Sequence, residues 1–254
     1  MLVLLEKIFK VTFLLSLSVT IALYFFKDSL PPASFYDAGS LSEPLQEPTR
    51  QNSFTINVNN ETYLIEPRYD YELEGVIVSY HNADDFSDIW HHARWKDFIN
   101  LRDLCVVWGS NVETGVYLDL NFHNDSWTCW VSWPNAEVGQ RFQKHELSNN
   151  HVLVDDESVR KVLMKSEPGD HIRLRGVLAE YSNPGSGFTR STSITRDDTG
   201  NGACETIYVT DFEIVKKANP ELRLIYAIAK WCAIIALAGF LVLFLVAPYK
   251  GRYA

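Results

Sequence analysis

The first long apolar run of the chain lies at its beginning, in residues 8–27. Sixteen residues without a charge stand between Lys10 and Lys27. A helix that crosses a bilayer needs about 20 predominantly apolar residues, and this segment reaches that length if the Lys10 side chain snorkels. The segment 8–27 therefore predicts a transmembrane helix or an uncleaved signal anchor. The alternative is a cleaved signal peptide, but the bulky residues 24–26 are unlike the small residues of a cleavage site.

The second apolar run lies near the other end, in residues 224–247. No charge interrupts Trp231 to Ala247, and aromatic residues stand near both edges of this stretch, where indole and phenol rings favour the lipid headgroup region. Pro248 ends the helical pattern, and Lys250 and Arg252 follow it. This segment predicts a second transmembrane helix.

Between the apolar ends, residues 28–52 are polar and contain four prolines, with Ser, Glu and Asp between them. This composition is typical of an extended, solvated linker. The following segment, 53–215, changes to alternating apolar and polar positions, which predict β-strands. The predicted strands cover residues 54–58, 62–66, 74–80, 104–108, 117–122, 127–133, 172–179 and 206–215.

Two segments of this middle region have a helical period instead. Residues 155–166 carry acidic side chains in the first turn, Lys165 in the last and apolar residues on one face, and Pro168-Gly169 follows. Residues 86–98 show a shorter apolar stripe at helical spacing. The long segment 182–205, rich in Gly, Ser, Thr, Arg and Asp, predicts a loop between the last two strands.

The order of these elements is a set of strands, a helix and two more strands, which is the chain order of an OB-fold. Pro168-Gly169-Asp170 leads into an alternating strand with a central Gly176, and this segment resembles the fourth strand of small bacterial OB-like domains. The resemblance covers roughly residues 71–215 and brings no catalytic motif with it. It implies a mainly β protein, an OB-like small β-barrel with one or two short helices, flanked by two transmembrane helices.

The charge of the chain changes once it is divided. The whole chain has 23 Lys+Arg and 32 Asp+Glu, a net charge of −9. The middle segment, residues 27–223, holds 18 basic and 31 acidic residues, which give it a net charge of −13. A domain this acidic repels nucleic-acid phosphates on average, so we expect no nucleic-acid partner.

Two spans would place both termini on one side of the membrane. Lys7 and Lys10 precede the first span, and Lys27 alone follows it closely. Since cytoplasmic flanks carry an excess of Lys and Arg, this arrangement favours a bacterial inner-membrane protein with both termini in the cytoplasm and the middle domain in the periplasm.

Candidate metal ligands gather in residues 86–98. Asp88 and His92 stand four residues apart, on one side of the predicted helix, and His91 lies beside them. Imidazole and carboxylate at this spacing can hold Zn²⁺ or a similar ion. The alternative is a polar helix face with a His–Asp contact, and since no further ligand stands at a diagnostic distance, we expect no cofactor.

The cysteines allow two interpretations. Cys105 and Cys129 belong to predicted neighbouring strands and would form a disulfide in an extracytoplasmic domain, whereas buried free thiols are the alternative. Cys204 is a weaker candidate for a nucleophile, because nothing in the sequence places a base beside it.

Candidate ligand-binding residues fall into two groups. Gly200 and Gly202 could let backbone amides form an anion nest with Arg190 and Arg196, although a flexible surface loop explains the same residues. Trp130 is predicted on the strand face opposite Trp127 and Trp133, and an exposed ring there could bind a ligand. Arg173 and Arg175 would flank such a face.

These observations predict a membrane-tethered, non-enzymatic binding or assembly module that contacts a protein or an envelope component. The alternative is a metal-dependent or thiol enzyme that uses Asp88, His91 and His92, or Cys204. The sequence leaves the oligomeric state open.

Overall fold

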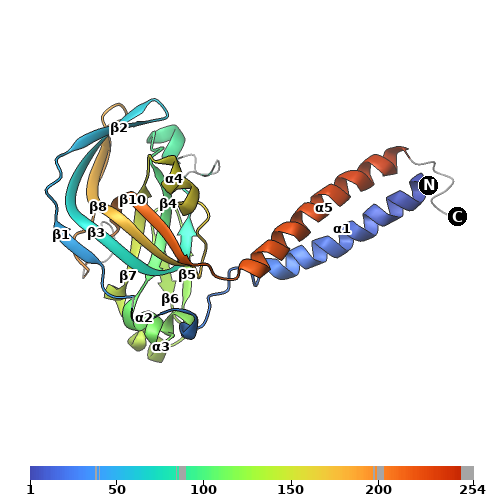
Figure 1. The fold of residues 1–254 in the computed structure, drawn as a ribbon, viewed down its shortest axis with the longest axis horizontal. Coiled ribbons are helices and arrows are strands. Elements are labelled where there is room, and N and C mark those ends of the chain that lie inside the picture. Colours follow the sequence, from blue (N-terminus) through green and yellow to red (C-terminus); the bar gives the residue numbers. More distant parts are fainter. Residues whose placement is uncertain are drawn as a thin grey trace. The chain divides into compact units, whose positions relative to one another are not determined.

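The computed structural model describes residues 1–246 except 38, 40, 84, 86–89, 197 and 199–202, with the backbone alone of Trp90 and His91 (Figure 1). The chain forms two compact units, each described by itself below. One unit joins Met1–Ser29 to the C-terminal segment from Asn219, and the other comprises Leu30–Ala218.

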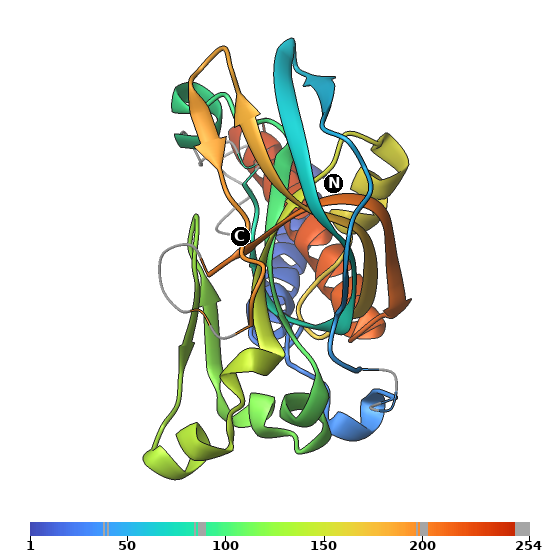
Figure 2. The same cartoon turned by 90° about the vertical axis from the view of Figure 1, so that its left-hand side faces the viewer.

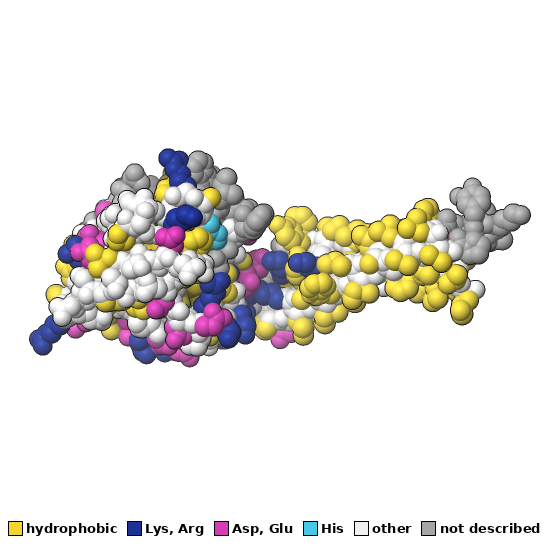
Figure 3. Space-filling model, turned by 90° about the horizontal axis from the view of Figure 1, so that it is seen from above, with side chains coloured by type: hydrophobic (Ala, Val, Ile, Leu, Met, Phe, Trp, Pro, Cys, Tyr) yellow, Lys and Arg dark blue, Asp and Glu magenta, His cyan; other side chains and the backbone are white. Residues whose placement is uncertain are grey.

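The first unit consists of two helices, α1 (Leu2–Tyr24) and α5 (Pro220–Val246), which lie side by side (Figure 1). Three alanines of α5 are buried, and a Cβ atom added to Gly239 would meet the ring of Phe9 at 2.6 Å. Most other apolar side chains of the pair are exposed, and they cover much of the visible face of the helices in Figure 3.

Within the described residues, one helix is long and apolar enough to cross a membrane, and it is α5. It contains most of the span predicted at 224–247. The helix predicted at 8–27 is present as α1, but it begins at Leu2 and so includes Glu6, Lys7 and Lys10, which interrupt its apolar run. The two-span arrangement is therefore supported for the C-terminal helix only.

The second unit is β-rich, as predicted. Its described residues form a mixed sheet of eight strands and a separate two-stranded hairpin. The eight strands are β1 (Leu45–Pro48), β2 (Phe54–Val58), β3 (Glu61–His81), β4 (Asn100–Val107), β7 (Leu147–Leu153), β8 (His171–Asn183), β9 (Phe188–Arg190) and β10 (Glu205–Lys216). The hairpin consists of β5 (Asn121–Asn124) and β6 (Cys129–Ser132), and it stands apart from the large sheet in Figure 2.

Five strands of the large sheet form a circuit of pairings. β3 pairs with β4, β4 with β7, β7 with β10, and β10 with β8, which pairs again with β3. Only the β7–β10 pairing of this circuit is parallel. Fully buried apolar side chains pack between these strands, and they include Leu73, Leu104, Leu174 and Ile207.

Two glycines allow these strands to approach one another closely. A Cβ atom on Gly176 of β8 would overlap the backbone carbonyl oxygen of Tyr208 in β10, and one on Gly75 of β3 would meet Val106 of β4. The mid-strand glycine predicted in residues 172–179 therefore marks a close backbone contact.

The helices of this unit are short. Helix α4 (Glu157–Leu163) lies inside the predicted segment 155–166, and the Asp156 carboxylate caps it by accepting hydrogen bonds from the backbone N–H groups of Ser158 and Val159 at 2.7 and 3.1 Å. The other helical segments are α2 (Gly109–Glu113), α3 (Ala136–Arg141), the 3₁₀ turns Ala33–Phe35, Val116–Asp119 and Lys144–Glu146, and a π-helical turn, Trp90–Arg94.

Two segments differ from the sequence prediction. Residues 28–52 are not a solvated linker throughout, because β1 pairs with β3 and both Tyr36 and Leu41 are buried in the core. The Tyr36 hydroxyl donates to the Gly169 carbonyl oxygen at 2.8 Å. The segment predicted as a strand at 117–122 overlaps the turn Val116–Asp119, and the strand β5 begins only at Asn121.

Candidate functional site

A cleft of about 920 Å³ opens between the β5–β6 hairpin and the segment that follows β9. One wall is formed by Trp127–Val131, and the opposite wall by residues 189–191, 195–196 and 203–205. Ser148 and Asn149 of β7 lie between the walls. The rim carries the exposed side chains of Lys144 and His145. A concave site of this size with apolar and polar groups is typical of ligand binding.

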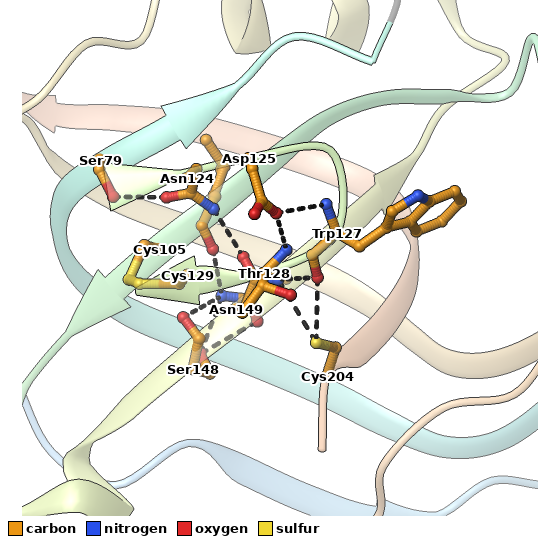
Figure 4. The surroundings of a disulfide bond; sticks show 12 residues. Ser79, Cys105, Asn124, Asp125, Trp127, Thr128, Cys129, Ser148, Asn149 and Cys204 are labelled. Carbon is orange, nitrogen blue, oxygen red and sulfur yellow. Dashed lines mark hydrogen bonds between the residues drawn. A yellow bond between two sulfur atoms is a disulfide. The ribbon is translucent and has the colours of Figure 1, made fainter. Parts of the chain in front are cut away.

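A disulfide fixes the hairpin wall to the large sheet. Cys129 of β6 is bonded to Cys105 of β4, with 5.8 Å between their Cα atoms, so the structure joins the two cysteines that the sequence paired (Figure 4). The Asn124 amide donates to the Asn149 side chain at 2.9 Å, and the Ser79 hydroxyl donates to Asn124. Asn149 in turn donates to the Trp127 carbonyl oxygen at 3.0 Å. These ties hold the short hairpin in one position.

Trp130 presents an aromatic surface in this wall. Its side chain is 58 % exposed, and its indole N–H donates to Asp125 at 2.7 Å. The Asp125 carboxylate also accepts hydrogen bonds from the backbone N–H groups of Trp127 and Thr128. Desolvation works against ionisation, but these hydrogen bonds hold the pKa of Asp125 below its ordinary value. The exposed ring of Trp130 is therefore fixed in orientation by an ionised partner.

Arg190, on the opposite wall, belongs to a buried polar chain. Its guanidinium lies 4.0 Å above the Trp127 ring and donates to Nε2 of His151. Nδ1 of His151 is 2.5 Å from the Asp103 carboxylate, and both side chains are fully buried. Burial alone would raise the pKa of Asp103, but the imidazole and its hydrogen bond hold it below its ordinary value. The positive charge of Arg190 is thus balanced by the Asp103 carboxylate through His151.

Arg196 is engaged by three partners. It pairs with Glu205, and its other nitrogen donates to Gln46 and to the Tyr71 hydroxyl at 3.0 and 3.1 Å. Glu205 is 3 % exposed. Burial raises the pKa of Glu205 to about 8, although the Arg196 charge opposes the shift. Among the described residues, Oε2 of Glu205 has no hydrogen-bond partner, and Glu205 lines the cleft.

Cys204 also lines the cleft, but its surroundings do not activate it. Its thiol lies 3.4 Å from the Asn149 amide and 3.6 Å from the Trp127 carbonyl oxygen. Burial raises the pKa of the Cys204 thiol. Reactive cysteines have a lowered pKa, because the thiolate is the nucleophile. The other cysteine outside the disulfide, Cys232, lies exposed in α5.

The structure brings together some of the predicted ligand-binding residues and not others. Trp130, Arg190 and Arg196 line one cleft. Arg173 and Arg175 lie elsewhere on β8, where they form a surface ladder of ion pairs with Glu74 and Glu72. The predicted Gly200 and Gly202 are outside the described residues.

The predicted metal ligands are only partly described. Asp88 is outside the described residues, as is the side chain of His91, whereas the His92 ring stacks on Phe98 at 5.0 Å between centroids. In the described part of the chain, no group of three His, Cys, Asp or Glu side chains is placed to hold a metal ion.

Most residues of the cleft were not predicted as ligand-binding residues from the sequence, and Trp133 and Glu205 are two that matter. Trp133, assigned to the face of Trp127, is 42 % exposed and lines the cleft together with Phe142. Glu205 is the first residue of β10. The sequence did not mark it as a ligand-binding residue, because a single acidic residue at the start of a strand belongs to no recognisable motif.

Comparisons with models of known protein families, with curated proteins and with solved structures find no match for this chain. The function is therefore inferred from the geometry of the cleft and from the character of the two units.

Proposed function

We propose that this protein is a membrane-tethered, non-enzymatic binding or assembly module, whose OB-like domain lies outside the cytoplasm and contacts a protein or an envelope component. One observation carries the proposal: the cleft displays an exposed tryptophan, Trp130, whose orientation is fixed by Asp125. Exposed tryptophans held in place are typical of the residues that dominate binding energy at interfaces.

The strand pairing supports an OB-like barrel. The five-strand circuit has the strand order of an OB-fold, with the one parallel pairing between its third strand, β7, and its last, β10. Helix α4 lies between β7 and β8 in the chain, where this fold carries its helix. In this interpretation β1, β2 and β9 extend the barrel, and the β5–β6 hairpin is an insertion that provides a wall of the cleft.

The packing of the helices supports two membrane spans. Helix α1 lies along α5, and its 23 residues correspond to about 35 Å, close to the thickness of a bilayer core. The start of α1 and the end of α5 lie at the same end of the pair (Figure 1). If α5 spans a membrane, the hairpin places both ends on one side.

The disulfide supports the proposed side of the membrane. Disulfides persist in oxidising compartments such as the bacterial periplasm and are rare in the cytoplasm. The Cys105–Cys129 bond therefore favours a periplasmic domain. Lys7 and Lys10 in the first turns of α1 then lie toward the cytoplasmic side, in agreement with the positive-inside rule. The domain charge of −13 favours a partner other than nucleic acid.

Site-specific photo-cross-linking in cells tests this proposal. A photoreactive phenylalanine analogue replaces Thr195, which is exposed on the cleft wall, or, as a control, Glu213, which is exposed on β10 away from the cleft. We expect an adduct from position 195 only. Trp130→Ala should reduce the yield of this adduct at least about tenfold, because loss of an anchoring tryptophan costs about 2 kcal/mol or more. Equal adducts from both positions, or none from position 195, would contradict the proposal.

A further inference from the structure

The β6 strand presents its edge to the cleft. Residues 127–131 all line the cleft, without a gap. Within β6 these are Cys129, Trp130 and Val131. Because successive side chains of a strand point to opposite faces, a wall that includes three consecutive strand residues follows the edge of the strand rather than one of its faces. The other edge of β6 is covered by β5, with Phe122 opposite Val131 and Asn124 opposite Cys129.

The hydrogen bonds of the hairpin identify which backbone groups point outward. The Asp125 N–H donates to the Thr128 carbonyl oxygen at 3.1 Å, so these two residues form a hydrogen-bonded pair next to the turn. Hydrogen-bonded and non-hydrogen-bonded pairs alternate along an antiparallel ladder. Cys129 and Val131 are therefore in non-hydrogen-bonded pairs, and their N–H and C=O groups point away from β5.

No described strand pairs with this outer edge of β6. In the described part of the chain, β6 pairs with no strand other than β5, and no hydrogen bond outside that pairing uses the backbone of Cys129 or Val131. On the facing wall, residues 189–191 also line the cleft without a gap, and among the described strands β9 pairs with β8 alone. An unpaired strand edge is a template for a further strand, because its N–H and C=O groups are already arranged for a ladder.

Three further features suit this edge to an extended chain. The disulfide at Cys129 and the Asp125–Trp130 hydrogen bond hold it in place, which lowers the entropy lost on binding. Trp130 and Trp133 stand beside it, where alternate side chains of an added strand would lie. Glu205 lines the same cleft and buries an oxygen atom without a hydrogen-bond partner among the described residues, and a polar backbone group of the ligand would satisfy it.

We propose that the ligand of the cleft is an extended polypeptide segment, which binds by adding a strand to the outer edge of β6. This inference rests on the proposed binding function and specifies its ligand class. A glycan or a lipid could contact Trp130, but neither offers the regular alternation of donors and acceptors that the backbone of Val131 requires.

The test uses the full-length chain in cells with the photoreactive residue at position 195, and it compares two substitutions at one position. Val131→Pro removes the outward N–H but leaves the hydrogen-bonded pairs with β5, since Val131 is in a non-hydrogen-bonded pair. Val131→Thr keeps the N–H and the branched shape. Formation of the Cys105–Cys129 disulfide shows that each variant has folded, and thiol alkylation measures whether this disulfide has formed.

We expect mass spectrometry of the wild-type adduct to identify a cross-linked peptide. Val131→Pro should lower the adduct yield about tenfold, as expected for one lost hydrogen bond and a blocked edge, and Val131→Thr should change it less than about twofold. A synthetic peptide that spans the cross-linked stretch should also slow hydrogen exchange at the Cys129 and Val131 amides of the wild-type protein in detergent. This measurement needs no variant.

Three results would overturn the inference. An adduct with a glycan or a lipid would exclude a polypeptide ligand, and a peptide that leaves both amides unprotected, or an adduct yield unchanged by Val131→Pro, would exclude strand addition. All of these leave the binding function itself intact. Absence of any adduct from position 195 would overturn both the inference and the proposed function.

Discussion

The five-strand circuit and the cleft beside it are stabilised in different ways. Inside the circuit, apolar side chains such as Leu73, Leu104 and Leu174 pack against one another. The cleft walls are short segments held by a disulfide and by buried polar chains that end in Arg190 and Arg196. Apolar packing is non-directional and distributed over many contacts, whereas each hydrogen bond, ion pair or disulfide fixes the relative position of two particular residues. The comparison suggests that the circuit provides stability and that the ties fix the geometry of the binding surface.

The largest effect should come from breaking the circuit at Gly176. Gly176→Val places a side chain against the Tyr208 carbonyl oxygen, which is backbone and cannot move aside. We expect a loss of more than about 5 kcal/mol in the free energy of unfolding, enough to abolish cooperative unfolding. Circular dichroism during thermal unfolding in detergent measures this loss. Gly39→Ala is the control, since its nearest neighbour would be 3.6 Å away, and a Gly176→Val protein with an unchanged transition would refute the account of the circuit.

The next effect should come from the buried polar chain behind the cleft. Asp103→Ala leaves His151 and Arg190 without their anionic partner, and we expect the free energy of unfolding to fall by about 3–5 kcal/mol, as for other broken buried ion pairs. Urea unfolding followed by tryptophan fluorescence gives the value. Asp211→Ala removes an exposed partner of Arg175 instead and should change the stability by less than about 0.5 kcal/mol. Equal losses in the two variants would mean that the buried chain contributes no more than the surface ladder.

Removal of the disulfide should have a somewhat smaller effect and should act mainly on the hairpin. Cys105→Ala combined with Cys129→Ala opens a link across 24 residues, which corresponds to about 3 kcal/mol in the chain-entropy description. We expect faster hydrogen exchange in residues 121–132 and a weaker cross-link from position 195, with the circuit still folded. Cys204→Ser should leave both measurements unchanged. Loss of the whole fold in the double variant would show that the hairpin is not separable from the circuit.

The last effect concerns pH and is spread over several pH units, so it is the smallest for a single step of one unit. A carboxyl group whose pKa is raised by folding, here Glu205 from 4.5 to about 8, contributes stability below pH 4.5 and loses that contribution as the pH rises through 8. Between these values the free energy of unfolding should fall by up to about 1.4 kcal/mol per pH unit because of this group. Glu205→Gln cannot ionise, so the difference between the two proteins should change across pH 5–8. Parallel pH profiles in urea unfolding would contradict this assignment.

The circuit and the cleft also differ in how much of each could be predicted from the local sequence. The period-two pattern located most strands of the circuit, because alternation is imposed by one buried face. The sequence left Cys105 and Cys129 as either a disulfide or free thiols, and the structure bonds them to each other. The four arginines had no distinguishing pattern. Arg173 and Arg175 face outward beside carboxylates of β3, and Arg190 and Arg196 reach buried partners that are remote in the chain.

The sequence by itself determined the β-rich character of the middle domain, the apolar C-terminal helix and the capped helix α4, because period, hydropathy and capping act between near neighbours. Only the tertiary structure decided that residues 28–52 add a strand and that a cleft exists. The parallel β7–β10 pairing brings Asn149 to Cys204, 55 residues away, and the disulfide brings β6 to the same place. Contacts of this range depend on which strands pair, and alternation along a single strand carries no information about its partner.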